Sequence, residues 1–251
     1  MTIAADIKGL TVCFGKRTVV RNLTLKLPAE GVTVLIGRSG SGKTTFLRAL
    51  NRLNECLPGS RTVGTVQLLI GGRLMPVYAP DVNLSLLRRR VGMVFQTPNV
   101  LPASIRQNML LPLQLTTGLL PGEREVRIRH ALEAVGLWEA VRDRLGESAA
   151  ALSGGQQQRL CLARTLALEP EIILLDEPTA SLDPATTQDI ELLLQRLAER
   201  YALIMVSHGL SQARRLGSRM VLFGDNHRYA VLKPEDLPQE HELNELFGGE
   251  I

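Results

Sequence analysis

The octet Gly37-Arg38-Ser39-Gly40-Ser41-Gly42-Lys43-Thr44 is a complete match to the pattern GxxxxGK[ST]. It follows the β-branched, mainly apolar run Val32–Ile36 and precedes a stretch with helical periodicity, Thr44–Leu53. Its glycines allow the backbone to wrap around a polyanion with successive N–H groups pointing inward. The helix that follows adds its positive end. The octet therefore predicts a nucleotide-phosphate loop, with Lys43 at the β- and γ-phosphates and Thr44 as a Mg²⁺ ligand.

Two further polar sequences lie more than a hundred residues downstream. Leu152-Ser153-Gly154-Gly155-Gln156 begins a helical stretch, in which Ser153 can act as the cap. Paired glycines destabilise a helix, so they favour a close approach by another group. The apolar run Ile172–Leu175 then leads into Asp176-Glu177. Carboxylates at the end of a buried strand are placed to hold Mg²⁺ or to act as a general base, although they can also simply cap the strand.

In this order and at this spacing, the three sequences resemble the ATP-binding cassette (ABC) ATPases of membrane transporters. The resemblance implies that Asp176 holds Mg²⁺ and that Glu177 is the base that polarises the attacking water. It also implies that the Ser153–Gln156 turn binds the γ-phosphate of an ATP held by a second copy of the chain. Two ATP molecules would thus be sandwiched in a head-to-tail dimer. The residues expected at ATP in trans are Ser153, Gly154, Gly155 and Gln156.

Four accessory positions also match this family. Gln96 resembles the glutamine that contacts Mg²⁺ and water, and His208 resembles the switch histidine at the γ-phosphate. Asp183, in Ser181-Leu182-Asp183, resembles the loop that crosses the dimer interface. Phe14 is placed like the aromatic residue that stacks on adenine, although an aromatic residue in a strand can also belong to the core. The complete ATP set in cis is Phe14, Gly37, Arg38, Ser39, Gly40, Ser41, Gly42, Lys43, Thr44 and Thr45.

One departure from the family pattern stands beside His208. The next residue is usually acidic or polar, and here it is Gly209. We expect this glycine to loosen the histidine loop without removing the imidazole.

The alternation of elements predicts an α/β fold. We expect a P-loop NTPase core with a mainly parallel sheet, an N-terminal antiparallel β-subdomain and a helical insertion. Strands are expected near 3–14, 19–27, 32–36, 63–70, 171–175, 202–206 and 220–223. Asp183 and Pro184 mark the start of a helix. Residues 1–251 would form a single domain with a helical subdomain at about 97–165, and the tail after Pro234 would form one peripheral helix.

Composition excludes several other classes of protein. The net charge of +4, from 29 basic and 25 acidic residues, is too weak to predict nucleic-acid binding. The run Arg88-Arg89-Arg90 is interpreted as a solvated or helix-end cluster. Three scattered cysteines fit neither a disulfide framework nor a metal site. No leader is apparent and no apolar run reaches the roughly 18–20 residues of a membrane span. We therefore expect a peripheral protein at the cytoplasmic face of the cell membrane.

Within the family, segments between the motifs resemble the ATPase subunits of phosphate importers. These segments are 50–55, 58–61 and 87–99, whereas the region after His208 fits less well. Importers of other oxyanions, amino acids or metals remain alternatives, as does a soluble cassette ATPase. The expected partners are permease subunits and an extracytoplasmic solute-binding protein. The permease would dock on Gln96–Pro121 through Val100, Leu101, Ile105, Met109, Leu110 and Leu111, unless these side chains pack the helical insertion.

Overall fold

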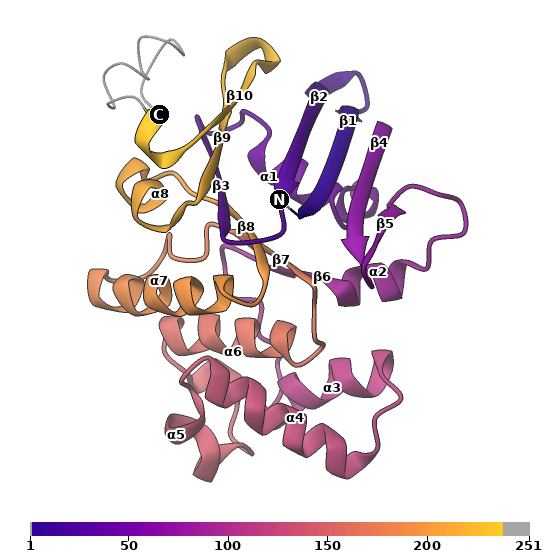
Figure 1. The fold of residues 1–251 in the computed structure, drawn as a ribbon. Coiled ribbons are helices and arrows are strands. Elements are labelled where there is room, and N and C mark those ends of the chain that lie inside the picture. The colour runs from indigo at the N-terminus through magenta and orange to yellow at the C-terminus, as the bar shows by residue number, and fades with distance from the viewer. Residues whose placement is uncertain (1, 238–251) are drawn as a thin grey trace.

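Two sheets and a layer of helices make up the computed structural model, which describes residues 2–237 (Figure 1). One sheet is antiparallel, with the strand order β2-β1-β4-β5. The other has the order β10-β9-β3-β8-β7-β6 and is parallel except for the pairing of β10 with β9. The strands are β1 (Ile3–Phe14), β2 (Arg17–Pro28), β3 (Val32–Gly37), β4 (Ser60–Ile70), β5 (Arg73–Pro76), β6 (Val91–Val94), β7 (Ile172–Asp176), β8 (Ala202–Val206), β9 (Arg219–Phe223) and β10 (Tyr229–Leu232).

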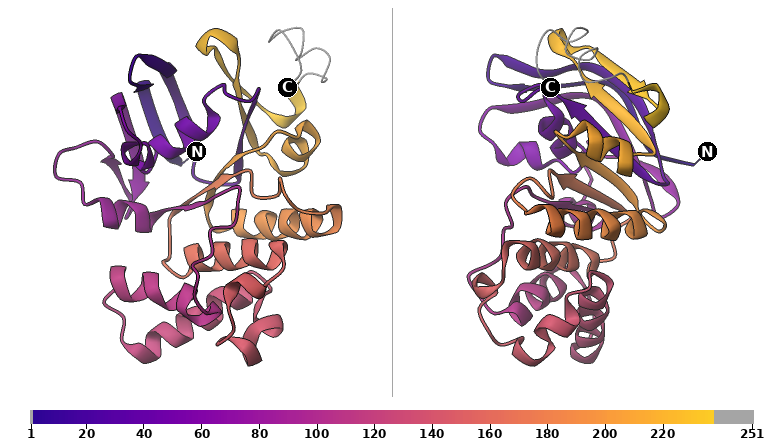
Figure 2. Two further views of the ribbon diagram at one scale, coloured as in Figure 1. Left: turned by 180° about the vertical axis from the view of Figure 1, so that it is seen from behind. Right: turned by 90° about the vertical axis from the view of Figure 1, so that its left-hand side faces the viewer.

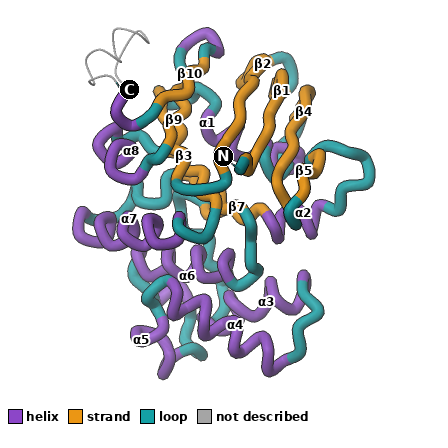
Figure 3. The backbone as a smooth tube through the Cα atoms, in the orientation of Figure 1, coloured by secondary structure: helices purple, strands orange, loops and turns teal. Residues whose placement is uncertain are grey.

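Helices cover both faces of the six-stranded sheet. The first, α1, packs between the two sheets, whereas α6 and α7 cover the opposite face and α3, α4 and α5 lie beyond α6 (Figures 1 and 3). The views in Figure 2 show the same layers from behind and from the side. The helices are α1 (Lys43–Ala49), α2 (Leu84–Arg90), α3 (Ile105–Thr116), α4 (Pro121–Ala134), α5 (Trp138–Val141), α6 (Gly154–Leu166), α7 (Pro184–Ala198) and α8 (Leu210–Leu216).

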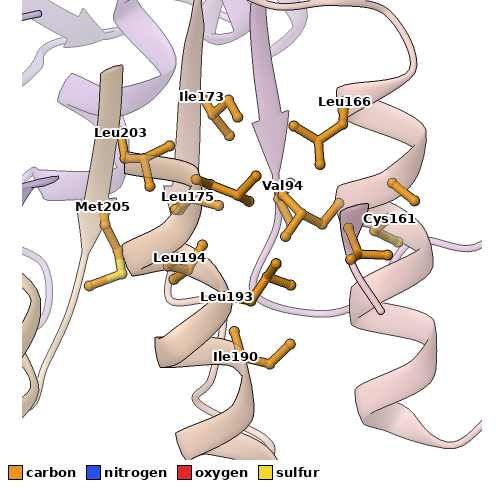
Figure 4. Close-up of a cluster of buried hydrophobic side chains, with 14 of the residues drawn as sticks. Val94, Cys161, Leu166, Ile173, Leu175, Ile190, Leu193, Leu194, Leu203 and Met205 are labelled. Atoms are coloured by element: carbon orange, nitrogen blue, oxygen red, sulfur yellow. The ribbon is translucent and has the colours of Figure 1, made fainter. Parts of the chain in front are cut away.

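The central strands are apolar on both faces because each face has its own helices. Successive side chains of a strand point to opposite sides, so β7 divides its residues between two cores. Ile173 and Leu175 face α6 and α7, while Ile172 and Leu174 face α1 and the antiparallel sheet. Figure 4 shows the first of these cores, where strand side chains meet Ile190, Leu193 and Leu194 of α7 and Cys161 and Leu166 of α6.

The helix after the phosphate loop is shorter than predicted. It ends at Ala49 instead of Leu53, and Arg52 takes a left-handed conformation (φ 59°) before a short 3₁₀ turn. The Tyr78 hydroxyl donates to the carbonyl of Ala49 at 2.8 Å, which a helix reaching Leu53 would use for the N–H of Leu53. Arg88 donates to the carbonyls of Asn51 and Arg52, and the buried Asn54 donates to the carbonyl of Thr45 at 2.8 Å. The segment 50–55, which resembles phosphate importers, is thus held in place by side-chain hydrogen bonds and has a structural role.

The arginine cluster ends α2, in agreement with the helix-end interpretation. Its members are half-buried, and they tie neighbouring segments together. Arg89 donates to the carbonyls of Thr116 and Leu168, and Arg90 lies 3.4 Å from the Glu171 carboxylate. These contacts indicate that the arginine cluster has a structural role.

The remaining differences lie at the sheet edges and at the C-terminus. The sequence does not predict strands β5 and β10, because all four residues of β5 are exposed and β10 has no buried position. After Pro234 the structure has a short 3₁₀ turn to Asp236, and the rest of the predicted peripheral helix lies outside the described residues. No helix within residues 2–237 is long and apolar enough to cross a membrane.

Candidate nucleotide site

Four loops meet at one edge of the parallel sheet. Strands β3, β6, β7 and β8 are parallel, with Leu35 and Asp176 both in register with Val206, and Val94 in register with Leu175. The loops that follow these strands therefore begin side by side at the carboxyl edge, where α/β sheets bind ligands. The fold thus brings together the phosphate loop, the Asp176-Glu177 pair, the loop of His208 and the loop of Gln96.

The phosphate loop depends on glycine for two different reasons. Gly37, Gly40 and Gly42 all have positive φ values, between 79° and 139°. A Cβ at Gly37 would lie 2.2 Å from the carbonyl oxygen of Phe223, and one at Gly42 would lie 2.9 Å from that of Val19. At Gly40 a Cβ would meet open space. Gly37 and Gly42 therefore pack the loop onto its own scaffold, and Gly40 leaves its outer side free.

Lys43 is buried at the start of α1 and folds back onto the loop. Its Nζ donates to the carbonyls of Gly37, at 2.5 Å, and Arg38, at 2.8 Å. Burial lowers the pKa of this ammonium from its ordinary value, and the carboxylates of Glu177 and Asp176 offset part of that shift. A buried cation held by neutral carbonyls gains from an anionic partner such as a phosphate.

Thr44 and Asp176 join the phosphate loop to β7. The Thr44 hydroxyl donates to Oδ1 of Asp176 at 2.7 Å, and Arg48 lies 3.7 Å from the other carboxylate oxygen. Asp176 is buried, with 5% of its surface exposed. The pair presents a hydroxyl oxygen and a carboxylate to one point, and hard divalent cations such as Mg²⁺ prefer oxygen donors of this kind.

Glu177 contacts His208 across the ends of β7 and β8. Oε1 of Glu177 lies 2.6 Å from Nε2 of His208, and the glutamate side chain is 13% exposed while the histidine is 43% exposed. Glu177 also has a left-handed backbone (φ 48°), which is costly for a residue with a side chain. This conformation turns the carboxylate away from the strand direction and toward the neighbouring loop.

Lys43, Thr44, Glu177 and His208 line one open cleft of about 340 Å³, and the buried Asp176 lies behind its lining, where it contacts Thr44. Phe14 forms one wall at the end of β1, where it is half-buried and also packs against the core between the sheets. Arg17 and Val19 line the same wall from β2, and Arg17 pairs with Phe14 in the strand register. Sequence reasoning missed these last two residues, because only the β1–β2 pairing brings them to the loop. The predicted residues that line the cleft are Phe14, Ser39, Gly40, Gly42, Lys43, Thr44, Thr45, Glu177 and His208.

The other predicted residues of the loop have different surroundings. Arg38 lies 3.5 Å from Asp225, on the turn between β9 and β10. The hydroxyl oxygen of Ser41 is buried and has no hydrogen-bond partner among residues 2–237. Gln96 is exposed just beyond β6 and is absent from the lining of the cleft within the described part of the chain. Gln158, a buried residue of α6 that sequence reasoning did not select, donates to the carbonyl of Phe95 beside it.

The turn at Ser153 lies away from this cleft. Ser153 caps α6, accepting from the backbone N–H of Gln156 at 3.3 Å, while the Gln156 side chain accepts from the Ser153 N–H. A Cβ at Gly155 would lie 2.4 Å from Cγ2 of Thr186, so the close approach predicted here is made by the same chain. At Gly154 a Cβ would meet only Leu182, at 3.8 Å. Gly154 is therefore exposed, and its lack of a side chain keeps the surface at the start of α6 accessible to another group.

Asp183 caps α7, as predicted. Its Oδ1 accepts from the backbone N–H groups of Ala185 and Thr186, at 3.1 and 3.0 Å. The hydrogen bonds from Thr186 are the main reason why the pKa of this carboxyl falls below its ordinary value. The capping role explains the residue within one chain, and its predicted role at a dimer interface stays a prediction.

Known proteins resemble this chain in sequence and fold. A family model described as ABC transporter matches residues 20–180. A phosphate import ATP-binding protein PstB from Mycobacterium intracellulare is 50% identical over 215 residues, covering 85% of this chain and 73% of that protein. PstB 2 from Bacillus licheniformis is 38% identical over 250 residues, covering 97% and 90%. The solved structure of cbiO1 from Clostridium perfringens, part of the ABC transporter complex cbiONQ, has a TM-score of 0.79 at 21% identity, covering 98% and 94%. This last likeness confirms the predicted fold.

Proposed function

The chain belongs to the ABC transporter family, and from this premise we propose that it is the ATP-hydrolysing subunit of a phosphate importer. The observation that carries the enzymatic part is the single cleft lined by Lys43, Thr44, Glu177 and His208, with Asp176 hydrogen-bonded to Thr44 directly behind it. The solute is proposed from the relatives, whose names specify phosphate import.

The cleft suits the triphosphate of ATP. The buried Ser41 hydroxyl lacks a partner within residues 2–237, and the backbone at Gly40 is open to an approaching group. A phosphate would replace the carbonyls of Gly37 and Arg38 as the acceptor for Lys43, giving a charge-assisted hydrogen bond. The aromatic ring of Phe14 at the other side of the cleft provides a flat apolar surface for adenine.

Mg²⁺ fits the oxygen donors of Thr44 and Asp176. No group of three or more His, Cys, Asp or Glu side chains among residues 2–237 could hold a metal by itself. This agrees with Mg²⁺ bound through few protein ligands, since the ion keeps waters and phosphate oxygens in its shell. When bound, the ion would neutralise charge on the β- and γ-phosphates. Gln96, predicted as a further ligand, would have to move toward the cleft from its exposed position.

Glu177 is proposed as the general base. Its carboxylate is mostly buried and lies within the cleft, so it can accept a proton from a water placed against the γ-phosphate. When ATP is present, His208 would exchange its hydrogen bond with Glu177 for one with the γ-phosphate. The change frees the carboxylate at the moment when a water must be polarised.

A second copy of the chain is proposed to complete the site. Ser153 and Gly154 are exposed and lie outside the cleft of their own chain, which supports their proposed contact with a nucleotide held by another copy. The Ser153 hydroxyl and the free N–H groups at the start of α6 form an anion-binding end. Asp183 would lie at the same interface.

Permease subunits are proposed to dock on the helical layer, which we treat as a subdomain spanning about 97–165. Two of the apolar residues expected at this surface, Ile105 and Met109, are fully buried, so they pack the layer instead. The exposed leucines of α3 are Leu111, at 43%, and Leu115, at 74%, and Leu120 follows at 67%. Apolar side chains exposed to this degree favour a partner. The protein would thus lie at the cytoplasmic face of the membrane and work with an extracytoplasmic solute-binding protein.

Paired substitutions in the purified protein test the enzymatic proposal. Lys43→Ala should weaken ATP binding about 10- to 100-fold, because a charge-assisted hydrogen bond is lost. Glu177→Gln should bind ATP normally and lose about 10²- to 10⁴-fold in turnover, because an amide cannot accept the proton. Glu171→Gln, at the other end of β7, is the control that should keep its turnover. Near-normal hydrolysis by Glu177→Gln would contradict the assignment of the base.

A further inference from the structure

Gln212 of α8 bridges the two loops that carry Glu177 and His208. Its Oε1 accepts a hydrogen bond from the Ser207 hydroxyl at 2.8 Å. Its Nε2 donates to the hydroxyl of Thr179 at 2.9 Å and to the carboxylate of Glu191 at 3.0 Å. One half-buried side chain thus joins the loop after β8, the loop after β7 and helix α7.

The two hydroxyls flank the Glu177–His208 contact. Ser207 immediately precedes His208, is 2% exposed, and accepts the N–H of Gly209 at 3.1 Å. The loop is therefore held on both sides of the histidine through one hydroxyl. Thr179 stands two residues after Glu177 and is 9% exposed. The hydrogen bonds from Ser207 to Gln212 and from Gln212 to Thr179 thus form a second connection between the two loops, in addition to the direct contact between Glu177 and His208.

An ion pair between the buried Glu191 and the exposed Arg215 fixes the direction of the amide. Glu191 is 7% exposed and accepts from Arg215 at 2.8 and 3.0 Å. Burial raises the pKa of Glu191, but the hydrogen bonds from Arg215 and Gln212 outweigh it and leave the pKa below its ordinary value. An ionised carboxylate only accepts hydrogen bonds, so it must face Nε2 of Gln212. This leaves Oε1 of Gln212 directed at Ser207.

We infer that Gln212 is a positioning residue, which holds His208 in register with Glu177 for ATP hydrolysis. The inference rests on the proposed ATPase function. Gly209 has no side chain with which to anchor the histidine loop, and a Cβ there would come no closer than 3.6 Å to Gln212. Through its hydrogen bond with Ser207, Gln212 restrains the histidine loop in place of a side chain at position 209. Gln212 is absent from the lining of the proposed ATP cleft among residues 2–237, and it lines an adjacent pocket behind Glu177 and His208.

Steady-state hydrolysis by purified variants separates positioning from general stability. Gln212→Ala should lower kcat about tenfold and leave KM for ATP within about twofold, because a small misplacement of reacting groups affects the chemical step. Gln195→Ala is the matched control: it removes another hydrogen bond between α7 and α8, from Gln195 to the carbonyl of Arg215 at 3.3 Å, without contact with either loop. This control should have normal kcat, and the Tm of both variants is measured to show that each is folded at the assay temperature.

A double-mutant cycle then tests the bridge itself. Thr179→Val keeps the shape of the side chain and removes its hydroxyl, so alone it should lower kcat in the same way. Because both changes break one bridge, the double variant should be no slower than the slower single variant. Additive losses, or a kcat for Gln212→Ala within twofold of wild type, would overturn the inference. A wild-type protein that does not hydrolyse ATP would instead overturn the proposed function.

Discussion

Replacing Gly155 with alanine would place a methyl group 2.4 Å from Cγ2 of Thr186, where α6 meets α7. Carbon atoms in contact prefer about 3.5–4.0 Å, so more than an ångström must be recovered by movement of the Thr186 side chain or of one helix. Gly154→Ala is the matched change one residue earlier, where the nearest atom belongs to Leu182 at 3.8 Å. Gly155 is thus required for the packing of α6 against α7, whereas Gly154 keeps an exposed surface free of a side chain.

The expected loss of stability follows from two opposing effects. A methyl group that falls more than an ångström short of contact distance belongs to the upper part of the overpacking range, at about 2–3 kcal/mol, and alanine in place of glycine in a helix returns about 1 kcal/mol. Gly155→Ala should therefore lose about 1–2 kcal/mol of the free energy of unfolding. For a chain of this size that is a fall in Tm of about 2–8 °C. Gly154→Ala gains the helix contribution without the clash, and its Tm should stay level or rise.

A compensating change sharpens the test. Thr186→Ser removes Cγ2 and keeps the hydroxyl that hydrogen-bonds with Asp183. The pair Gly155→Ala with Thr186→Ser should recover the lost stability and also ATP turnover, since the new methyl group points into its own chain. Gly154→Ala should keep its stability and lose ATP-dependent association, because its methyl group stands on the surface proposed to meet the second ATP.

Thermal unfolding and ATP hydrolysis, measured on the same preparations, provide the readout. Wild-type stability in Gly155→Ala, or no recovery on adding Thr186→Ser, would refute the packing argument. A double variant that is stable but inactive would show that Gly155 itself serves the nucleotide.

The remaining predictions concern association and docking. Mg²⁺-ATP should roughly double the mass of the Glu177→Gln protein in light scattering, because ATP bound between two copies stabilises the dimer by linkage; a monomer at saturating ATP would argue against the shared site. Leu115→Glu should lower solute uptake by the assembled transporter and spare hydrolysis by the isolated chain, because a 74% exposed leucine is replaced on the proposed docking surface. Val231→Glu, 43% exposed on β10, is its control, and normal uptake by Leu115→Glu would remove this surface from the docking site.

Sequence patterns predicted the central sheet well because its strands are buried on both faces. The runs that became β3, β7 and β8 are continuous and apolar, and each is followed by polar residues at the carboxyl edge. The edge strands β5 and β10 have no such signal, since β5 is exposed throughout and β10 is at most half-buried. The end of α1 differs from the prediction because Tyr78, far away in sequence, occupies the carbonyl of Ala49.

The candidate site divides along similar lines. Residues adjacent to a strand end, such as Lys43, Thr44 and Glu177, could be predicted because the sheet itself brings them together. Arg17 and Gln212 could not, since their positions depend on strand pairing and on packing of α8 against α7. A short motif predicts which functional groups are present in the site. It does not predict which side chains from other elements orient those groups.

Uptake of radiolabelled phosphate by cells lacking this chain tests the central claim most directly. The measurement is made at low external phosphate with other phosphate carriers removed, and cells are complemented with the wild-type chain or with Glu177→Gln. The wild-type chain should restore phosphate uptake and Glu177→Gln should not, because binding without hydrolysis cannot drive repeated transport cycles. Undiminished phosphate uptake in cells lacking the chain, together with a defect for another oxyanion or an amino acid, would contradict the proposed solute.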